Sequence, residues 1–259
     1  MDIAVSIVLA AILVALTLKK KAFTLGAALT AAVILVTAAV CGSYGGIFIV
    51  LAAYGVIFAV DLVIGDRSES VTGQINQKSG ARDVMQVLSN ALAAVIALVI
   101  GKIIGNDAFI VVYAAALTEC LADSLASDVG VLSKKDPVDI CRFRRVRRGI
   151  SGGVSLLGSL SAFAGCLFMA LFTVIFFGFV PKYFLTVLLT PMVGMLADSV
   201  MGSLLQAKYT CAVCGKLTEK RVHCDTPCRL TGGVRFLNND AVNIISNFIT
   251  ALLAAAVLI

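Results

Sequence analysis

Long apolar blocks dominate this sequence, and many of them run for about 20 residues with few or no charged side chains. An α-helix needs about this length to cross a hydrocarbon layer of ~30 Å. Hydrophobic residues make up 60% of the chain and charged residues 14%, whereas soluble domains are about half apolar and about a quarter charged. The sequence therefore predicts an all-α, polytopic membrane protein and excludes a soluble globule.

The apolar blocks predict about eight transmembrane helices. Three lysines and no small-residue cleavage site follow the first block, so we expect it to be a membrane anchor and not a removed signal peptide. The predicted spans are Ile3–Leu18, Ala22–Val40, Ile47–Ile64, Val84–Ile104, Ala108–Ala126, Ile150–Val180, Tyr183–Gln206 and Ala241–Ile259.

The basic residues indicate the orientation of the chain. Nineteen of the 21 lysines and arginines fall in alternate connections, and only Lys102 and Lys182 fall on the other side. By the positive-inside rule the nineteen face the cytoplasm, which places both termini outside. The formal charge of +6 is therefore interpreted as topology plus a phosphate-binding surface, with no nucleic acid as partner.

A short pattern occurs twice. Leu-Ala-Asp-Ser at residues 121–124 recurs at 196–199, and each copy is followed, after a loop, by Gly-Gly-Val, at 152–154 and 232–234. Small apolar words recur by chance in membrane proteins, but two paired words in the same order favour an internal parallel repeat.

Acidic residues inside apolar spans are costly and usually line a polar site. Glu119 and Asp123 lie at i and i+4, on one helix face, and Asp128 follows at the boundary. Asp198 has Gly194 and Gly202 one turn away on either side, where another helix could approach closely. We expect Asp123 and Asp198 to share one shallow site near the cytoplasmic helix ends.

Amide side chains form stripes at the same helix ends. Such residues either join helices by hydrogen bonds or contribute to a site, and their shared depth favours a site. The stripes consist of Gln86 and Asn90 in one span and of Asn239, Asn243 and Asn247 beside Asp240 in another.

Basic residues near these ends could bind phosphate oxygens, arginine as a bidentate fork and lysine as a point charge. The glycine pairs are predicted at helix starts, where free N–H groups suit an anion. Carboxylates chelating Mg²⁺ around polyphosphate fit these residue types. The phosphate-contact candidates are Lys78, Arg82, Arg148 and Arg235, with Gly152, Gly153, Gly232 and Gly233.

Four of the eight cysteines are concentrated in the basic loop after the seventh predicted span, residues 207–239. The spacing is typical of a structural zinc knuckle, although a redox or unpaired cluster is the alternative. The predicted Zn²⁺ ligands are Cys211, Cys214, Cys224 and Cys228, with His223 as an alternative fourth ligand.

Several of these motifs together resemble an integral membrane family that includes the plastid phytyl-phosphate kinases and transmembrane protein nineteen. The resemblance runs from about residue 65 to the C-terminus, and the cysteine loop departs from it. The motifs are Thr72-Gly73 to Asp83 with Gln86 and Asn90, Leu121 to Gly130 with Ser124, Gly152-Gly153-Val154-Ser155, Asp198-Ser199 with Gln206, and Asn239-Asp240 with Asn243.

The resemblance implies CTP-dependent transfer of a phosphoryl group to a prenyl monophosphate, with residues 1–64 as an N-terminal three-helix segment and 65–259 as a catalytic membrane domain. Our hypothesis places this activity at the cytoplasmic face of the plasma membrane. Asp123 and Asp198, with Glu119, Asp128 and Asp240, would hold Mg²⁺. The basic candidates would neutralise the phosphoryl group, and Gln86, Asn90, Ser124, Gln206, Asn239 and Asn243 would position an isoprenoid phosphate and CTP. The alternatives are a lipid-phosphate cytidylyltransferase and a transporter or flippase of a phosphorylated lipid.

Overall fold

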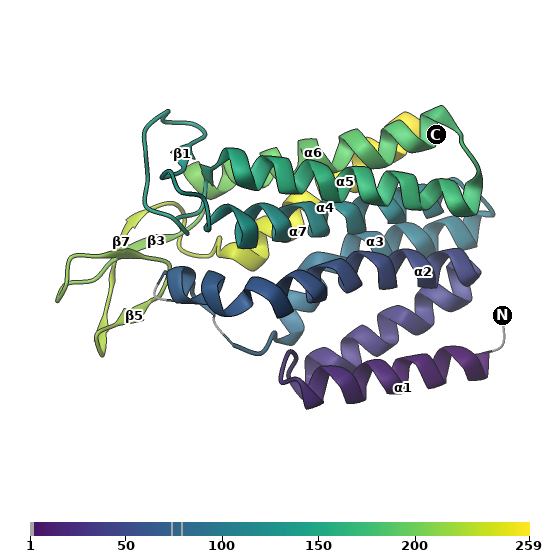
Figure 1. The fold of residues 1–259 in the computed structure, drawn as a ribbon, viewed down its shortest axis with the longest axis horizontal. Coiled ribbons are helices and arrows are strands. Elements are labelled where there is room, and N and C mark those ends of the chain that lie inside the picture. The colour runs from purple at the N-terminus through teal and green to yellow at the C-terminus, as the bar shows by residue number, and fades with distance from the viewer. Residues whose placement is uncertain (1–2, 74, 79) are drawn as a thin grey trace.

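In a computed structural model, residues 3–73, 75–78 and 80–259 are described, and these residues form seven helices with short strands gathered at one end (Figure 1). The helices are α1 (Ile3–Lys19), α2 (Leu25–Thr72), α3 (Val84–Ile104), α4 (Phe109–Gly130), α5 (Leu156–Phe177), α6 (Pro181–Leu204) and α7 (Asn239–Leu258).

The helices α2 to α7 are long and apolar enough to cross a membrane, which confirms the prediction of a polytopic helical membrane protein. Six helices among the described residues meet that length and hydropathy, and one of them is an element of 48 residues with a kink, so the count of eight separate spans stays a prediction. The first predicted span forms a helix of only 17 residues, α1. The second and third predicted spans belong to one element of 48 residues, α2.

The element α2 is bent at Ser43, which has a left-handed φ of 53°. Figure 1 shows its two arms running in opposite directions along the long axis. Gly46 lies where a side chain would collide with the Ala38 carbonyl of the first arm. The buried Tyr113 hydroxyl donates to the Gly46 carbonyl at 2.9 Å, which supplies a partner near the bend, where lipid offers none. The sequence predicted a six-residue loop here, and the chain instead turns through one residue.

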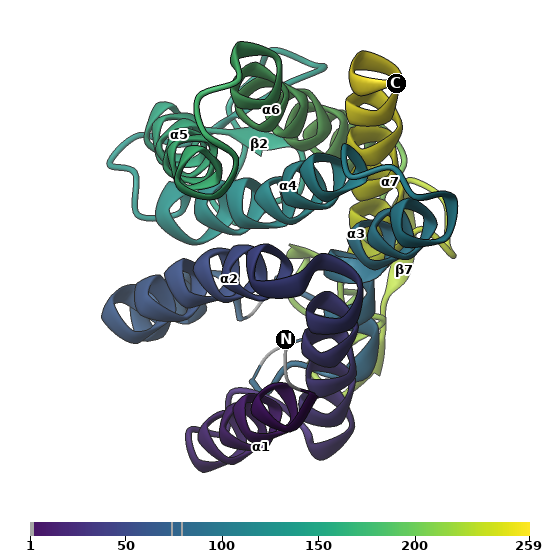
Figure 2. The same ribbon diagram turned by 90° about the vertical axis from the view of Figure 1, so that its right-hand side faces the viewer.

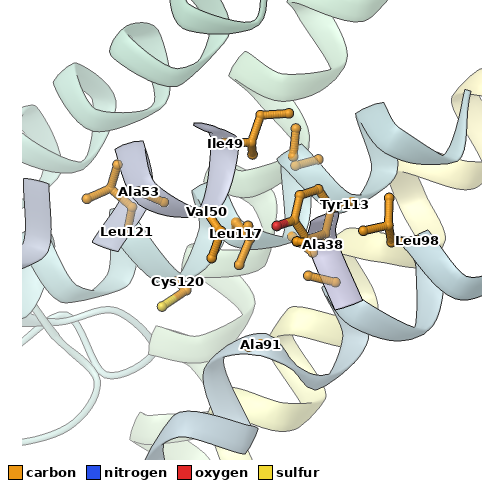
Figure 3. Close-up of a cluster of buried hydrophobic side chains, with 14 of the residues drawn as sticks. Ala38, Ile49, Val50, Ala53, Ala91, Leu98, Tyr113, Leu117, Cys120 and Leu121 are labelled. Atoms are coloured by element: carbon orange, nitrogen blue, oxygen red, sulfur yellow. The ribbon is translucent and has the colours of Figure 1, made fainter. Parts of the chain in front are cut away.

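The helix α4 occupies the centre of the bundle and packs against α2, α3, α5, α6 and α7 (Figure 2). Every side chain from Val111 to Ala122 is buried. In Figure 3, Tyr113, Leu117 and Leu121 of α4 pack among small and branched residues of α2 and α3. Three of the predicted acids, Glu119, Asp123 and Asp128, belong to α4. They therefore lie on a helix that five other helices hold in place.

The strands belong to the connections after α4 and α6. β1 pairs with β2, β3 lies between β4 and β7, and β5 pairs with β6, all antiparallel. Their bounds are β1 (Val138–Asp139), β2 (Gly153–Val154), β3 (Lys208–Thr210), β4 (Leu217–Thr218), β5 (Val222–His223), β6 (Thr226–Pro227) and β7 (Arg229–Gly232).

The strand-bearing connections lie at one end of the bundle, and α1 begins and α7 ends at the opposite end (Figure 1). The connection between α1 and α2 joins the strand end, since the Thr24 amide donates to the Arg82 carbonyl at 3.0 Å. The connections that carry most of the lysines and arginines therefore lie at the same end of the bundle. This agrees with the prediction from the alternation of basic loops along the sequence. The predicted domain boundary between residues 64 and 65 falls inside the second arm of α2 and stays a prediction.

Candidate functional site

A cavity of about 140 Å³ opens where α4 and α6 reach the strand end of the bundle. Three carboxylates line it, Asp123 and Asp128 from α4 and Asp198 from α6. Asn239, at the start of α7, and Arg148, from the connection after α4, line it as well. We call this space the acidic cavity. The structure thus brings together the two aspartates that the sequence placed in one site.

Close helix packing around Asp198 fixes its position. A side chain at Gly194 would collide with Thr250 Oγ1 of α7, and one at Gly202 would lie 3.0 Å from the Gly152 amide nitrogen. The two glycines therefore allow the close approach of a helix and of a loop, which confirms the expectation for this helix. The aspartates of the two Leu-Ala-Asp-Ser repeats, Asp123 and Asp198, line the same cavity. That the repeat arose by internal duplication stays a prediction.

Asn90, Asn243 and Asn247 lie behind the acidic cavity and connect α7 to the neighbouring helices. With its amide nitrogen turned toward α6, Asn243 donates to Asp198 Oδ2 at 3.1 Å. The same side chain lies 3.2 Å from Asn90 Oδ1 on α3. Ser246 Oγ also donates to Asp198 Oδ2, at 3.3 Å. Neutral donors from α7 therefore orient this carboxylate.

Glu119 is buried one turn deeper than Asp123 and does not line the acidic cavity. Asn247 Nδ2 donates to Glu119 Oε2 at 2.8 Å and to the Ala116 carbonyl at 2.8 Å. The contact fixes α7 against α4 at the level of the aspartates. Glu119 thus lies in a supporting position behind them.

A second cavity, of about 70 Å³, adjoins the first and shares Asn76 and Asn239 with it. We call it the lysine cavity because Lys78 Nζ lies on its wall, 2.5 Å from Asp240 Oδ2 and 2.7 Å from Asp83 Oδ2. Asp83 is also the N-cap of α3 in a capping box with Gln86. The loop before α3 is therefore tied to the first turn of α7.

The charges around the lysine cavity are partly buried. Burial alone would lower the pKa of Lys78, but the hydrogen bonds and the charges of Asp240 and Asp83 raise it above its ordinary value. Burial raises the pKa of Glu219, against the opposing effects of a hydrogen bond from Ser151 and the charge of Lys208. The lysine and its two partners therefore form a compact cluster of two ion pairs.

Glu219 is the residue that sequence reasoning missed. It is buried, lines the lysine cavity, and bonds through Oε1 to the Ser151 hydroxyl. Its backbone amide donates to the Ile75 carbonyl at 2.8 Å. A single glutamate in a polar loop gives no signal in the sequence, because charged residues are ordinary there.

The two glycine pairs were predicted at helix starts, but neither pair lies at one. Gly152 precedes β2, and α5 begins only at Leu156, so Gly152 and Gly153 do not start a helix. Gly152 has a φ of +85°, and a side chain on it would lie 2.5 Å from the Ser203 backbone. Gly232 and Gly233 likewise end six or more residues before α7. Both pairs therefore allow loops to pack on the end of α6, while Gly152 and Gly153 also line the acidic cavity.

The other basic candidates are dispersed. Arg148 donates to the Lys134 carbonyl at 3.0 Å and lies 3.6 Å from Asp136, at the rim of the acidic cavity. Arg235 and Gln206 line a narrow crevice that Asn239 and Glu219 also border. Arg82 and Ser124 line neither the acidic nor the lysine cavity, and the Arg82 backbone pairs with residues 22–24.

A third cluster lies at the tips of two hairpins in the connection after α6. One ligand atom each from Cys211, Cys214, His223 and Cys224 lies within 4.8 Å of the others. Cys228, predicted as a ligand, is not among these four, and its sulfur contacts the Thr226 carbonyl at 4.0 Å. The predicted alternative, His223, takes that place in the cluster.

Comparison with known proteins places the chain among membrane proteins. A family profile described as "Integral membrane protein DUF92" matches residues 8–251. Protein PGR of Arabidopsis thaliana is 29% identical over 179 residues, covering 65% of this chain and 58% of that protein. An uncharacterized membrane protein of Methanocaldococcus jannaschii is 28% identical over 127 residues, covering 49% and 52%. One of Synechocystis is 28% identical over 168 residues, covering 62% and 64%.

The chain thus matches between about half and two thirds of the length of these relatives. No solved structure matches the chain.

Proposed function

The chain belongs to the integral membrane family DUF92, and we propose that it is a Mg²⁺-dependent kinase that transfers a phosphoryl group from CTP to a prenyl monophosphate. The product would be the prenyl diphosphate, of the phytyl or geranylgeranyl type. The sequence resemblance to the phytyl-phosphate kinases supplies the nucleotide and the substrate class. The reaction would take place at the strand end of the bundle, facing the cytoplasm.

One observation carries this proposal: three carboxylates line a single cavity, and within the described part of the chain none of them has a lysine or arginine at ion-pair distance. Clustered carboxylates that lack a basic partner favour a bound cation. Their oxygen atoms are ligands that suit Mg²⁺. Asp123, Asp128 and Asp198 would hold the ion, which would neutralise charge on the CTP phosphates.

The residues around the carboxylates have separate tasks in this proposal. Arg148, whose ion pair with Asp136 is long and exposed, would turn toward the transferring phosphoryl group and stabilise its charge. Asn239 borders both cavities and would contact the acceptor phosphate. The acceptor is already an anion, so that in-line attack needs little help from a general base.

The position of the cavity suits a substrate with one charged and one apolar end. The cavity lies where apolar helices meet the polar connections, and Leu196 and Val200 of α6 are exposed on the bundle surface in the same turns as Asp198. A prenyl tail would remain in the lipid beside α6 while its phosphate reaches the aspartates. Phosphoryl transfer depends mainly on such positioning and on charge stabilisation.

The test is turnover by the full chain purified in detergent, with CTP, Mg²⁺ and geranylgeranyl or phytyl phosphate. Mass spectrometry should find prenyl diphosphate and an equal amount of CDP, and ATP in place of CTP should give less. Release of pyrophosphate with a CMP-lipid would assign a cytidylyltransferase instead. Nucleotide-independent movement of the lipid phosphate across vesicles, without turnover, would assign a transporter or flippase.

A further inference from the structure

The connection between α6 and α7 contains two hairpins whose tips meet. We call residues 207–238 the cysteine module. The first tip lies between β3 and β4 and carries Cys211 and Cys214. Its turn is closed by the Gly215 amide, which donates to the Cys211 carbonyl at 2.9 Å, and Gly215 has a φ of +68°. The turn brings the sulfur atoms of Cys211 and Cys214 within 4.8 Å of each other.

The second tip lies between β5 and β6 and carries His223 and Cys224. Cys224 and Asp225 form its two-residue loop, with φ values of 51° and 55°. Two successive positive φ angles define a type I′ turn, which Asn-Gly normally fills, so that a cysteine here is in a costly conformation. The turn places the Cys224 sulfur 3.1 Å from His223 Nδ1.

The distances between the two tips fit a metal ion. The Cys214 sulfur lies 3.6 Å from His223 Nδ1, and all four ligand atoms lie within 4.8 Å of one another. Ligands bonded to Zn²⁺ at about 2.0–2.3 Å in a tetrahedron lie roughly 3.3–3.8 Å apart. A small closure of the tips would therefore complete the coordination.

The tips have little else to hold them together. Val213 and Val222, the apolar residues beside them, are 66% and 57% exposed. A module of about 30 residues buries too little apolar surface to fix its shape, and such modules usually rely on metal ions or disulfides. All eight cysteines of the chain are free thiols. A metal ion held by the clustered thiols and the imidazole would supply such a link.

The opposite end of the cysteine module docks on the candidate site. Thr218 Oγ1 and the Glu219 amide both donate to the Ile75 carbonyl, at 2.9 and 2.8 Å, and Lys220 Nζ donates to the Gly73 carbonyl at 2.6 Å. These three residues directly follow the first tip along β4. The first tip and Glu219 are therefore connected through β4.

We propose that Cys211, Cys214, His223 and Cys224 bind one Zn²⁺ ion, and that this ion fixes the module that holds Glu219 against the loop before α3. In this proposal Cys228, whose thiol interacts with that of Cys211, is not one of the four ligands. With four protein ligands the site has no open position and is structural. This proposal does not depend on which reaction the acidic cavity supports.

The test is the zinc content of the full chain, purified in detergent through an affinity tag that contains no histidine. Wild type and Cys228→Ser should carry stoichiometric zinc, and Cys214→Ser and Cys224→Ser should lose most of it. Cobalt substituted into wild type and Cys228→Ser should give the same spectrum of three sulfur ligands and one nitrogen. Loss of zinc in Cys228→Ser with retention in His223→Ala would overturn the ligand set, and zinc-free wild type that binds no added zinc would overturn the site.

Hydrogen exchange of the wild type tests the structural consequence without a variant. Addition of a zinc chelator should accelerate exchange in peptides that cover residues 73–78 and 217–220. A peptide from α5 should be unchanged and serves as the control. Unchanged exchange in the first two peptides after the zinc has been removed would contradict the positioning of Glu219 by the metal.

Discussion

Acidic residues are stabilised differently in the bundle and in the connections. In the bundle, Asp198 and Glu119 accept hydrogen bonds from neutral donors of α7. In the connections, carboxylates are paired with cations: Asp83 with Lys78, and Asp139 with Arg142 at 3.6 Å. These bundle carboxylates therefore have no basic partner among the described residues, whereas several connection carboxylates do.

The difference teaches what each region is adapted to do. A charge that a protein compensates internally serves its structure, but a buried charge oriented by neutral donors stays available for a ligand of opposite sign. Because Ser246 and not a lysine donates to Asp198, the position of this carboxylate is fixed while no basic side chain compensates it. We therefore interpret the acidic cavity as the reactive region and the connections as its scaffold.

The largest effect is expected for Asp123→Asn and Asp198→Asn, which remove charge from the bundle with little change in shape. Each should reduce turnover of CTP by at least about 100-fold, since a metal ion supplies several kcal/mol of transition-state stabilisation. Initial rates of CDP formation measure the loss. Asp107→Asn, at the opposite end of the bundle, is the matched control and should retain activity. Turnover near the wild-type rate in either cavity variant would contradict the assigned role.

The sequence predicted the bundle acids because a carboxylate in an apolar span contrasts with its surroundings. It also predicted most helices from their apolar length. It missed the bend at Ser43, because glycines and small residues on both sides indicated a loop. It also placed the start of α5 too early, because the loop packing of Gly152 against Ser203 depends on a distant helix. Glu219 was missed since a charge in a polar loop gives no contrast.

Packing within the bundle is the next test of the comparison. Gly194→Ala adds a methyl group where Thr250 Oγ1 already lies and where Glu119 Cγ is 2.8 Å away. Overpacking of this kind costs about 1–3 kcal/mol, and the Ser246 carbonyl oxygen, 3.3 Å away, limits how far the new methyl group can shift. The thermal unfolding midpoint in detergent should fall clearly.

Gly55→Ala is the matched control for this substitution, because no atom lies within 4 Å of a side chain placed there. Alanine is also the better helix former, by about 1 kcal/mol, so the control should be neutral or more stable. Equal losses in the two variants would show that α6 and α7 are not held tightly around Asp198, and would weaken the interpretation of a fixed carboxylate.

In the connections the comparison predicts a loss of stability when a cation is removed. Lys78→Met leaves the buried Asp240 without its partner and should cost about 1–3 kcal/mol of unfolding free energy. The raised pKa of Lys78 means that its contribution is fully present below the ordinary lysine value, about 10.4, and is lost only above it. Unfolding at pH 7 therefore measures the whole effect. Lys134→Met, at an exposed position, should change the midpoint little, and an equal change would argue against the pair.

Glu219 provides the smallest expected effect, because it is a loop acid that is buried as the bundle acids are. Its raised pKa implies stability that is fully present below the unfolded glutamate value, about 4.3, and is lost as the pH rises through the folded value. Glu219→Gln has no such loss, so its free energy of unfolding relative to wild type should rise between pH 5 and pH 8. The expected rise is about 1 kcal/mol or less, the net contribution of one hydrogen bond. Ser151→Ala, which removes the hydroxyl that favours the charged form, should make the pH dependence of the otherwise wild-type chain steeper. A fall of this free-energy difference from pH 5 to pH 8 would contradict the prediction. Glu219 would then be a charged scaffold residue like Asp83 and would follow the pattern of the paired acids in the connections.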